Sequence, residues 1–179
     1  MPPAVLPVPL SELRVSKHFV PSHGPLPNSS ITNKPLLIYH SVFDRPSASA
    51  IESYLNSVGV VEPLWRYGMY PRTHFHSTTH EVLCVSSGKA RLCFGGEDNP
   101  GRVEPTVEAG DVMVVPAGMA HRLLVDFGRF DMVGCYPRGY DWDMCYGRPG
   151  EEGKIKAIEN LAWFEKDPIY DHQGPVLNV

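Results

Sequence analysis

The chain has few of the features that mark membrane proteins, nucleic-acid-binding proteins or secreted proteins. It has no apolar run near the roughly 18 residues needed to cross a bilayer, and no cluster of lysines and arginines that would follow a nucleic-acid backbone. Its 16 basic and 20 acidic residues give a formal net charge of −4. The first 15 residues lack the basic region and apolar core of a secretory signal. We therefore expect a cytoplasmic protein that binds neither membranes nor nucleic acids.

Cysteine is also scarce. The four cysteines stand at positions 84, 93, 135 and 145, and none forms a CxxC pair. Disulfides are rare in the cytoplasm, so the sequence predicts small buried apolar groups or free thiols.

Proline and glycine are abundant instead, with 18 and 16 residues, and long periodic stretches are few. This composition favours many short strands joined by turns. A chain of 179 residues is long enough for one core and too short for a second domain to be expected. We expect an extended N-terminal arm over residues 1–35, a first strand over 36–43, and a helix over 47–60 capped by Ser47. The strands of the main sheets are expected between 63 and 136, and a second helix within 151–166.

Three histidines and one glutamate stand at suggestive spacings. His74 and His76 are one residue apart, Glu81 follows five residues later, and His121 lies 40 residues beyond the glutamate. Alternate side chains of a strand share a face, so His74 and His76 can converge on one point. Three imidazoles and a carboxylate suit a divalent transition metal better than calcium or magnesium.

The glycines and prolines around these residues complete two motifs. The first runs from Gly68 through His74, His76 and Glu81 to Gly88, and the second from Gly110 through Pro116 and Gly118 to His121. These spacings resemble the paired motifs of the cupin superfamily, and further stretches between about residues 30 and 178 resemble its YjlB-like subfamily. The resemblance implies an all-β fold, the cupin double-stranded β-helix or jelly-roll barrel, with an N-terminal arm and short flanking helices. It also implies one cupin domain over 36–179, with a metal-binding core at 63–136.

Strand alternation sorts the residues near the motifs into those facing the metal and those facing away. Leu83 and Val85 are predicted to face it, and His80 to face the other layer together with Val82 and Cys84. On the strand that begins at His121, alternation predicts that Leu123 and Val125 line the pocket and that Arg122 points away.

Candidate catalytic residues are few. Tyr70 and Arg72 share the parity of His74 and His76, so they are candidates to contact a substrate, although a packed rim tyrosine and a surface arginine are equally good interpretations. His80 is either structural or a proton shuttle. A further group of aromatic residues either forms the mouth of the pocket or packs in the core. These residues are Trp65, Tyr136, Tyr140 and Trp142.

The resemblance favours an enzyme, because all four ligand positions are filled. The leading hypothesis is a metal-dependent oxidoreductase of the oxidase or dioxygenase type, with Fe(II) and dioxygen, acting on a small phenolic or polyketide-like metabolite of secondary metabolism. Zn, Mn, Ni, Cu or Co would suit the same ligands. The alternatives are a redox-neutral isomerase or lyase, such as a decarboxylase, and a non-catalytic small-molecule-binding protein. A homodimer through the arm and an exposed sheet edge is also expected.

Overall fold

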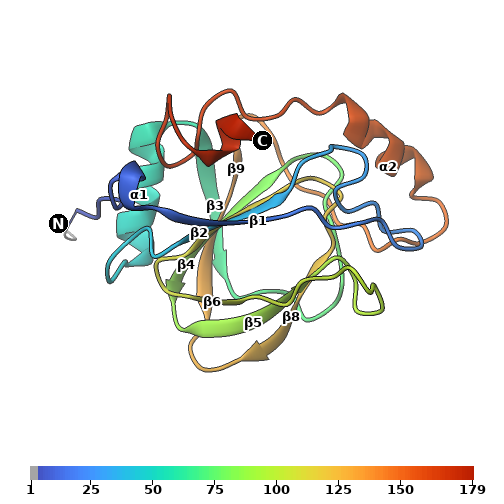
Figure 1. Ribbon diagram of the computed structural model, residues 1–179, viewed down its shortest axis with the longest axis horizontal. Coiled ribbons are helices and arrows are strands. Elements are labelled where there is room, and N and C mark those ends of the chain that lie inside the picture. Colours follow the sequence, from blue (N-terminus) through green and yellow to red (C-terminus); the bar gives the residue numbers. More distant parts are fainter. Residues whose placement is uncertain (1–3) are drawn as a thin grey trace.

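Two antiparallel sheets face each other and enclose a barrel-shaped core (Figure 1). The computed structural model describes residues 4–179, so the first three residues of the predicted arm lie outside the described part. One sheet has six strands in the order β1-β2-β7-β4-β9-β3. The other has three strands in the order β6-β5-β8. The all-β barrel expected from the sequence is confirmed.

The larger sheet is built from segments far apart in the sequence. Its strands, in chain order, are β1 (Arg14–His18), β2 (Leu36–His40), β3 (Val61–Tyr67), β4 (Glu81–Ser87), β7 (Val112–Val115) and β9 (Asp131–Pro137). The smaller sheet contains β5 (Lys89–Phe94), β6 (Thr106–Glu108) and β8 (His121–Asp126). The predicted N-terminal arm thus contributes β1, which pairs with β2 at the edge of the larger sheet.

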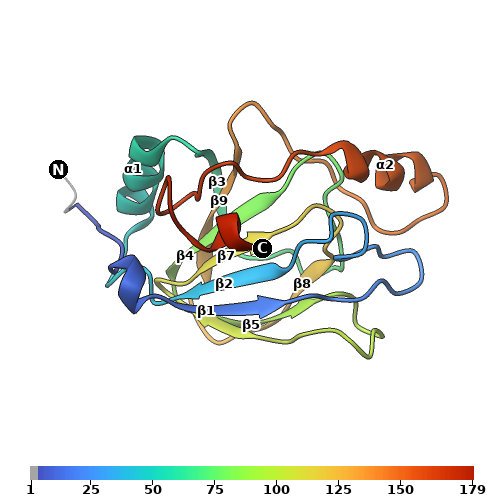
Figure 2. The same cartoon turned by 45° about the horizontal axis from the view of Figure 1, so that its top comes forward.

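The two faces of the larger sheet carry two separate hydrophobic clusters. Leu83 and Val85 of β4 belong to the cluster between the sheets, as alternation predicts. Val82 and Cys84 belong to the second cluster, on the outer face. That face is covered by α1 (Ala48–Val58) and by the C-terminal segment, which crosses over the sheet (Figure 2). All four cysteines are buried and free, which confirms the interpretation made from their spacing.

The helices agree with the sequence in place but differ in length. Ser47 caps α1 by accepting a hydrogen bond from the backbone N–H of Ala50, and Gly59 ends it in a left-handed conformation. The predicted second helix is short: α2 (Glu152–Ala157) is followed by a 3-10 turn (Ile158–Asn160). Two further 3-10 turns span Leu10–Glu12 and Pro175–Asn178. Among the described residues, no helix is long and apolar enough to cross a membrane.

Two motif glycines make turns that other residues would distort. Gly88 joins β4 to β5 with φ +71°, and a Cβ there would lie 2.4 Å from the carbonyl oxygen of Gly128. Gly110 precedes β7 with φ +100°, and a Cβ there would lie 2.3 Å from the carbonyl oxygen of Phe43. These turns set the register of β4 and β7, and β4 begins with Glu81.

Candidate metal centre

The sequence predicted a strand at His74 and His76. The structure has instead a short extended stretch that two isolated β-bridges hold in place. His74 exchanges two backbone hydrogen bonds with His121, of 3.2 and 2.9 Å. Phe75 exchanges two with Cys145, both of 2.9 Å. The alternation of side chains survives in this short extended stretch, so Phe75 is buried on the opposite side from the two histidines.

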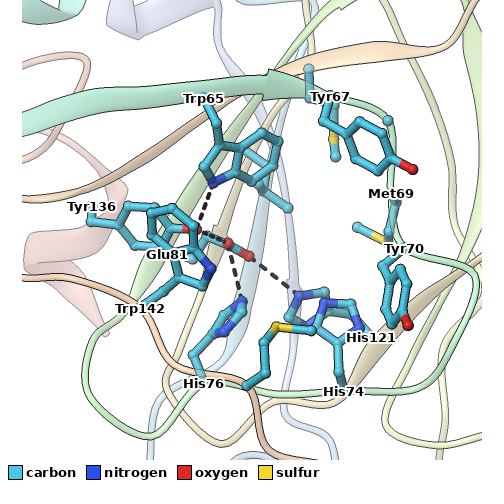
Figure 3. Close-up of a pocket in the computed structure, with 14 residues that line it drawn as sticks. Trp65, Tyr67, Met69, Tyr70, His74, His76, Glu81, His121, Tyr136 and Trp142 are labelled. Atoms are coloured by element: carbon cyan, nitrogen blue, oxygen red, sulfur yellow. Dashed lines mark hydrogen bonds and ion pairs between the residues drawn. The ribbon is translucent and has the colours of Figure 1, made fainter.

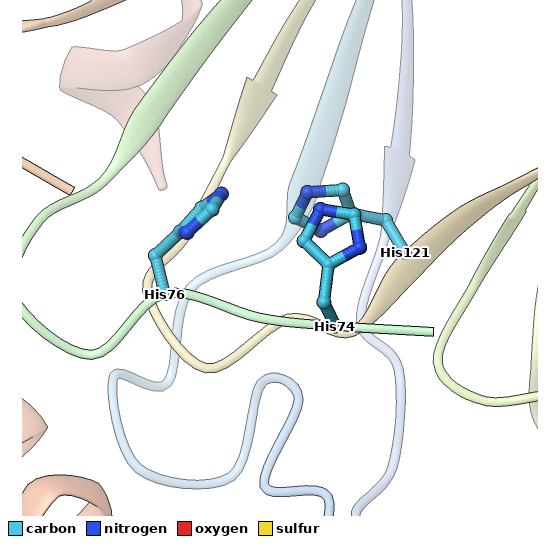
Figure 4. Close-up of side chains that lie close together, drawn as sticks. All are labelled: His74, His76 and His121. Carbon is cyan, nitrogen blue, oxygen red and sulfur yellow. The ribbon is translucent and has the colours of Figure 1, made fainter. Parts of the chain in front are cut away.

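The three histidines converge inside the barrel (Figure 4). One ring nitrogen from each of His74, His76 and His121 lies within 4.8 Å of the others. The three residues are 5%, 4% and 2% exposed. Three buried imidazoles at this spacing can together bind one small ion.

Hydrogen bonds fix the tautomer of all three rings. The Nδ1 atoms of His74, His76 and His121 lie 2.7, 2.6 and 2.8 Å from the backbone oxygens of Arg72, Asp143 and Met119. A carbonyl oxygen can only accept, so each Nδ1 carries a proton, and Nε2 is the ring nitrogen left to face the centre of the cluster. Burial and the neighbouring His121 lower the pKa of His74 to about 3, which keeps that ring neutral.

Glu81 completes the cluster at the start of β4 (Figure 3). Its Oε2 lies 3.2 Å from Nε2 of His76 and its Oε1 lies 3.3 Å from Nε2 of His121. Although burial opposes the shift, the facing His76 and His121 rings lower the pKa of Glu81 well below its ordinary value. The side chain is therefore an ionised carboxylate inside the protein.

The cluster has the donors that a transition metal requires. Nε2 of His76 and Oε1 of Glu81 are buried and make no hydrogen bond of good geometry, although each faces another member of the cluster, at 3.2 and 3.3 Å. Buried polar atoms without a partner are rare and costly, so two of them aimed at one point indicate that something else satisfies them. Neutral imidazoles with Nδ1 bonded to carbonyl oxygens are the usual form of histidine metal ligands. The residues thus fit the divalent metal that the sequence predicted.

A cavity of about 290 Å³ opens onto the cluster (Figure 3). Its walls are mostly apolar and aromatic. Besides the four cluster residues they comprise Trp65, Tyr67, Gly68, Met69, Tyr70, Leu83, Met132, Tyr136, Trp142 and Met144. Among the described residues, those that line this cavity include no lysine and no arginine.

One wall of the cavity is a chain of three hydrogen-bonded side chains. Nε1 of Trp65 donates to the Tyr136 hydroxyl at 2.8 Å, and that hydroxyl donates to Oε2 of Glu81 at 2.7 Å. Burial and the adjacent Glu81 carboxylate raise the pKa of Tyr136, so its hydroxyl stays protonated. Gly134 leaves the space for the indole, because a Cβ there would lie 2.0 Å from the Trp65 ring. The aromatic wall thereby fixes the orientation of Glu81.

The three candidate catalytic residues lie in different surroundings. Tyr70 lines the cavity at its rim and is 40% exposed. Arg72 lies outside, with its guanidinium 4.5 Å from the ring centre of Tyr146. His80 is also outside, and both of its nitrogens are engaged by backbone groups.

Nδ1 of His80 accepts from the N–H of Ala117 at 3.0 Å, and Nε2 donates to the oxygen of Ala162 at 3.0 Å. Burial lowers the pKa of His80 to about 4, so the ring is neutral. Neither Arg72 nor His80 is among the residues that line the cavity.

The predicted lining needs two corrections. Val125 does not line the cavity but is 42% exposed, because a β-bulge interrupts the alternation of β8. Leu92 pairs with Leu123 whereas Arg91 pairs with Val125, so one extra residue turns Val125 outward. Leu123 packs against the core between the sheets and is not part of the cavity wall.

Of the two interpretations open for the four aromatic residues, cavity lining holds for three. Trp65, Tyr136 and Trp142 line the cavity, whereas Tyr140 does not. The apolar floor that the sequence predicted is present, but thioethers rather than valine and leucine of β8 supply much of it. Met69, Met132 and Met144 come from three separate segments, and no periodic pattern in the sequence pointed to them.

Comparison with known proteins gives a family and one full-length relative. Residues 50–124 match the family model described as Cupin. The uncharacterized protein YjlB of Bacillus subtilis (strain 168) is 34% identical over 173 residues, which cover 94% of this chain and 98% of the relative.

Solved structures give more distant matches. Procruciferin, an 11S globulin from Brassica napus, is 13% identical with a TM-score of 0.37, over 63% of this chain and 22% of its own. An oxalate decarboxylase variant from Bacillus subtilis is 23% identical with a TM-score of 0.35, over 63% of this chain and 27% of its own. The chain thus spans about a quarter of the length of those two proteins.

Proposed function

The chain belongs to the cupin family, and from that membership and the geometry of the histidine cluster we propose that it is a metal-dependent oxidoreductase acting on a small organic molecule. His74, His76, Glu81 and His121 would hold the metal. The proposal is carried by the pair of partnerless buried atoms, Nε2 of His76 and Oε1 of Glu81, beside an apolar cavity. Fe(II) is the metal we propose, and Zn, Mn, Ni, Cu and Co share the ligand preference.

A metal held by four protein groups retains open positions on the side of the cavity. Three imidazoles and one carboxylate leave about two sites of an octahedral ion free. Bound Fe(II) would supply the electron transfer that joins an organic substrate to dioxygen. The protein's part is to orient the substrate against the aromatic wall and to exclude water from the ligands.

The cavity walls support an uncharged substrate with an aromatic or polyketide-like body. Trp142, stacked on the buried Tyr136, presents a flat face, and the three methionines can adapt to an irregular apolar outline. Tyr70 at the rim is the side chain we propose to contact a substrate oxygen. The described lining residues offer no cation to pair with an anionic substrate, apart from a bound metal.

The same walls favour oxidation over isomerisation or decarboxylation. Those redox-neutral reactions need a positioned group that moves a proton. The titratable side chains that line the cavity, apart from two rim tyrosines and the hydrogen-bonded Tyr136, are the four proposed metal ligands. A ligand committed to the metal is a poor general base, so we rank oxidation ahead of proton-transfer chemistry.

The quaternary state and the location are proposals from the sequence. Strand β1 lies at one edge of the six-stranded sheet, and an exposed edge of this kind suits the predicted homodimer. Size-exclusion chromatography with light scattering tests that state. We also propose a cytoplasmic location and a role in secondary metabolism.

The experiment that tests the function combines metal analysis with oxygen uptake. Protein purified without oxygen should contain close to one iron per chain and should consume oxygen when phenols or hydroxyketones are added. His121→Ala should lose both properties, because it removes a ligand from the centre of the cluster. One zinc, nickel or manganese per chain, with no oxygen uptake on any phenol or hydroxyketone, would contradict the proposal.

A further inference from the structure

The segment of residues 141–145 lies directly against the segment that carries His76. Cys145 exchanges its two backbone hydrogen bonds with Phe75, on one side of the histidine. On the other side, the Thr78 hydroxyl donates to the backbone oxygen of Asp141 at 2.6 Å. The backbone around His76 is therefore held at both ends by a segment more than 60 residues away in the sequence.

Asp143 makes the central contacts between the two segments. Its backbone oxygen accepts the Nδ1 proton of His76 at 2.6 Å. Its carboxylate accepts from the N–H of Ser77 at 2.7 Å and from the Ser77 hydroxyl at 2.5 Å. The residue thus binds the ring of one histidine through its main chain and the next residue of the ligand segment through its side chain.

Neither of the other two histidines depends on a distant segment in this way. Nδ1 of His74 donates to Arg72, and Nδ1 of His121 donates to Met119, each two residues earlier in the same stretch of chain. The orientation of His76 alone among the three is set by a residue from outside its own segment. A change at Asp143 should therefore act on one ligand of the cluster and leave two in place.

The segment that orients His76 also forms part of the cavity wall. Trp142 and Met144, on either side of Asp143, both line the cavity. The Trp142 ring stacks on Tyr136 with 5.1 Å between ring centres and 12° between planes. Tyr136 in turn donates to Glu81. Contacts thus link the cavity wall at Trp142 to both groups: to Glu81 through Tyr136, and to His76 through the neighbouring Asp143.

We propose that Asp143 is a positioning residue, which fixes Nε2 of His76 for metal binding and ties that ligand to the cavity wall. The inference rests on the proposed metal site and adds to it a specific residue outside the ligand set. Removing the Asp143 carboxylate releases Ser77, so only the flanking contacts of Cys145 and Asp141 then hold the backbone oxygen of residue 143 beside Nδ1 of His76. The His76 ring then gains rotational freedom, and metal binding must remove that freedom, which lowers the affinity for the metal.

Titration of metal-free protein with Co²⁺ tests this inference without any need for a substrate. The visible absorption bands of Co²⁺ report the geometry of its ligands, and the titration gives its affinity. Asp143→Ala should weaken Co²⁺ binding by about 10- to 100-fold, the range for lost partners of metal ligands, and should change the bands. Asp143→Asn keeps one oxygen for the Ser77 N–H and should recover most of the affinity.

A matched control and a milder variant complete the experiment. Asp141→Ala removes a carboxylate from the same segment but keeps the backbone oxygen that Thr78 binds, and it should bind Co²⁺ like the wild type. Ser77→Ala removes a single hydrogen bond to Asp143 and should give a smaller loss, which serves as the test if Asp143→Ala does not fold. Wild-type affinity and bands in Asp143→Ala, or in Ser77→Ala where Asp143→Ala does not fold, would overturn the positioning role alone. Failure of the wild type to bind Co²⁺ would overturn the metal site as well.

Discussion

The hydroxyl of Tyr136 donates a hydrogen bond of 2.7 Å to Oε2 of Glu81 inside the barrel. Trp65 donates to the same hydroxyl. The three hydrogen-bonded side chains therefore come from three neighbouring strands, β3, β9 and β4. The carboxylate has one oxygen held by these side chains and one oxygen without a hydrogen-bond partner, Oε1. The arrangement leaves a definite face of Glu81 directed at the histidines.

Tyr136→Phe should weaken metal binding without unfolding the protein. The change removes the donor to Glu81 and leaves the Trp65 N–H without its acceptor, so we expect about 10- to 100-fold lower Co²⁺ affinity and about 1–3 kcal/mol lower stability. Calorimetric titration and urea unfolding measure the two effects. Tyr67→Phe, at the exposed rim of the same cavity, is the control and should change neither. Equal Co²⁺ affinity in Tyr136→Phe and the wild type would show that Glu81 needs no such support.

His121→Ala should abolish stoichiometric metal binding while the barrel remains folded. His121 lies at the start of β8, and its backbone bonds to His74 do not involve the ring. Elemental analysis should find less than a tenth of the wild-type metal, and far-ultraviolet circular dichroism should be unchanged. His172→Ala, at an exposed position away from the cluster, controls for a general loss of histidine. Retained metal in His121→Ala would place the binding site elsewhere.

Metal removal should lower the stability of the wild type but not of His121→Ala. A metal that binds the folded chain alone stabilises it by about 2.7 kcal/mol at a concentration 100 times its dissociation constant. Urea unfolding with saturating Co²⁺, compared with the same experiment in a chelator, measures the difference. The partnerless atoms of His76 and Glu81 give the physical reason, since binding would satisfy both. No difference for the wild type would mean that these residues hold no metal.

Asp167 should make the protein less stable as the pH rises. Burial raises the pKa of Asp167, although Tyr39 and the backbone N–H groups of Ile169, Tyr170 and Val176 donate hydrogen bonds to it. The folded state therefore holds the proton more tightly than the unfolded state, whose pKa is about 3.9. This contribution to stability is complete below that value and is lost as the pH rises through the folded pKa.

Urea unfolding between pH 4 and pH 8 measures the effect of Asp167. Asp167→Asn should be destabilised by about 1–3 kcal/mol, because an amide cannot accept all four hydrogen bonds, and should lack this part of the pH dependence. Asp44→Asn, at an exposed position, should keep the wild-type profile. A stability difference between wild type and Asp167→Asn that does not change with pH would contradict the prediction.

The convergence of the three histidines follows partly from a local rule and partly from the family motif. His74 and His76 alternate over three residues, whereas Glu81 and His121 begin strands of different sheets and were joined to them by the resemblance to the cupin motifs. Val125 was predicted wrongly because the alternation is interrupted there. A β-bulge adds a single residue, leaves no mark in the composition of a short strand, and reverses every later position.

Strand alternation and motif spacing could not predict the contacts between segments that are distant in the sequence. From the sequence, Asp143 could be interpreted as part of a lid or as a residue of a turn, and its bonds to His76 and Ser77 depend on how the segment of residues 141–145 folds back over the barrel. The position of His80 was predicted correctly from parity, but its two backbone partners were not. Long-range hydrogen bonds of this kind arise from the closure of the fold and are not encoded in the spacing of nearby residues.

Gly134→Ala should disturb the aromatic wall of the cavity. A Cβ on Gly134 would lie 2.0 Å from the Trp65 ring, so the indole must move and break its bond to Tyr136. We expect a shifted tryptophan fluorescence maximum and at least tenfold weaker binding of an aromatic probe such as a naphthol. Gly153→Ala is the matched control, since a Cβ there has open space and the residue lies in α2. If Gly134→Ala keeps the fluorescence and probe affinity of the wild type, Trp65 does not shape the binding wall.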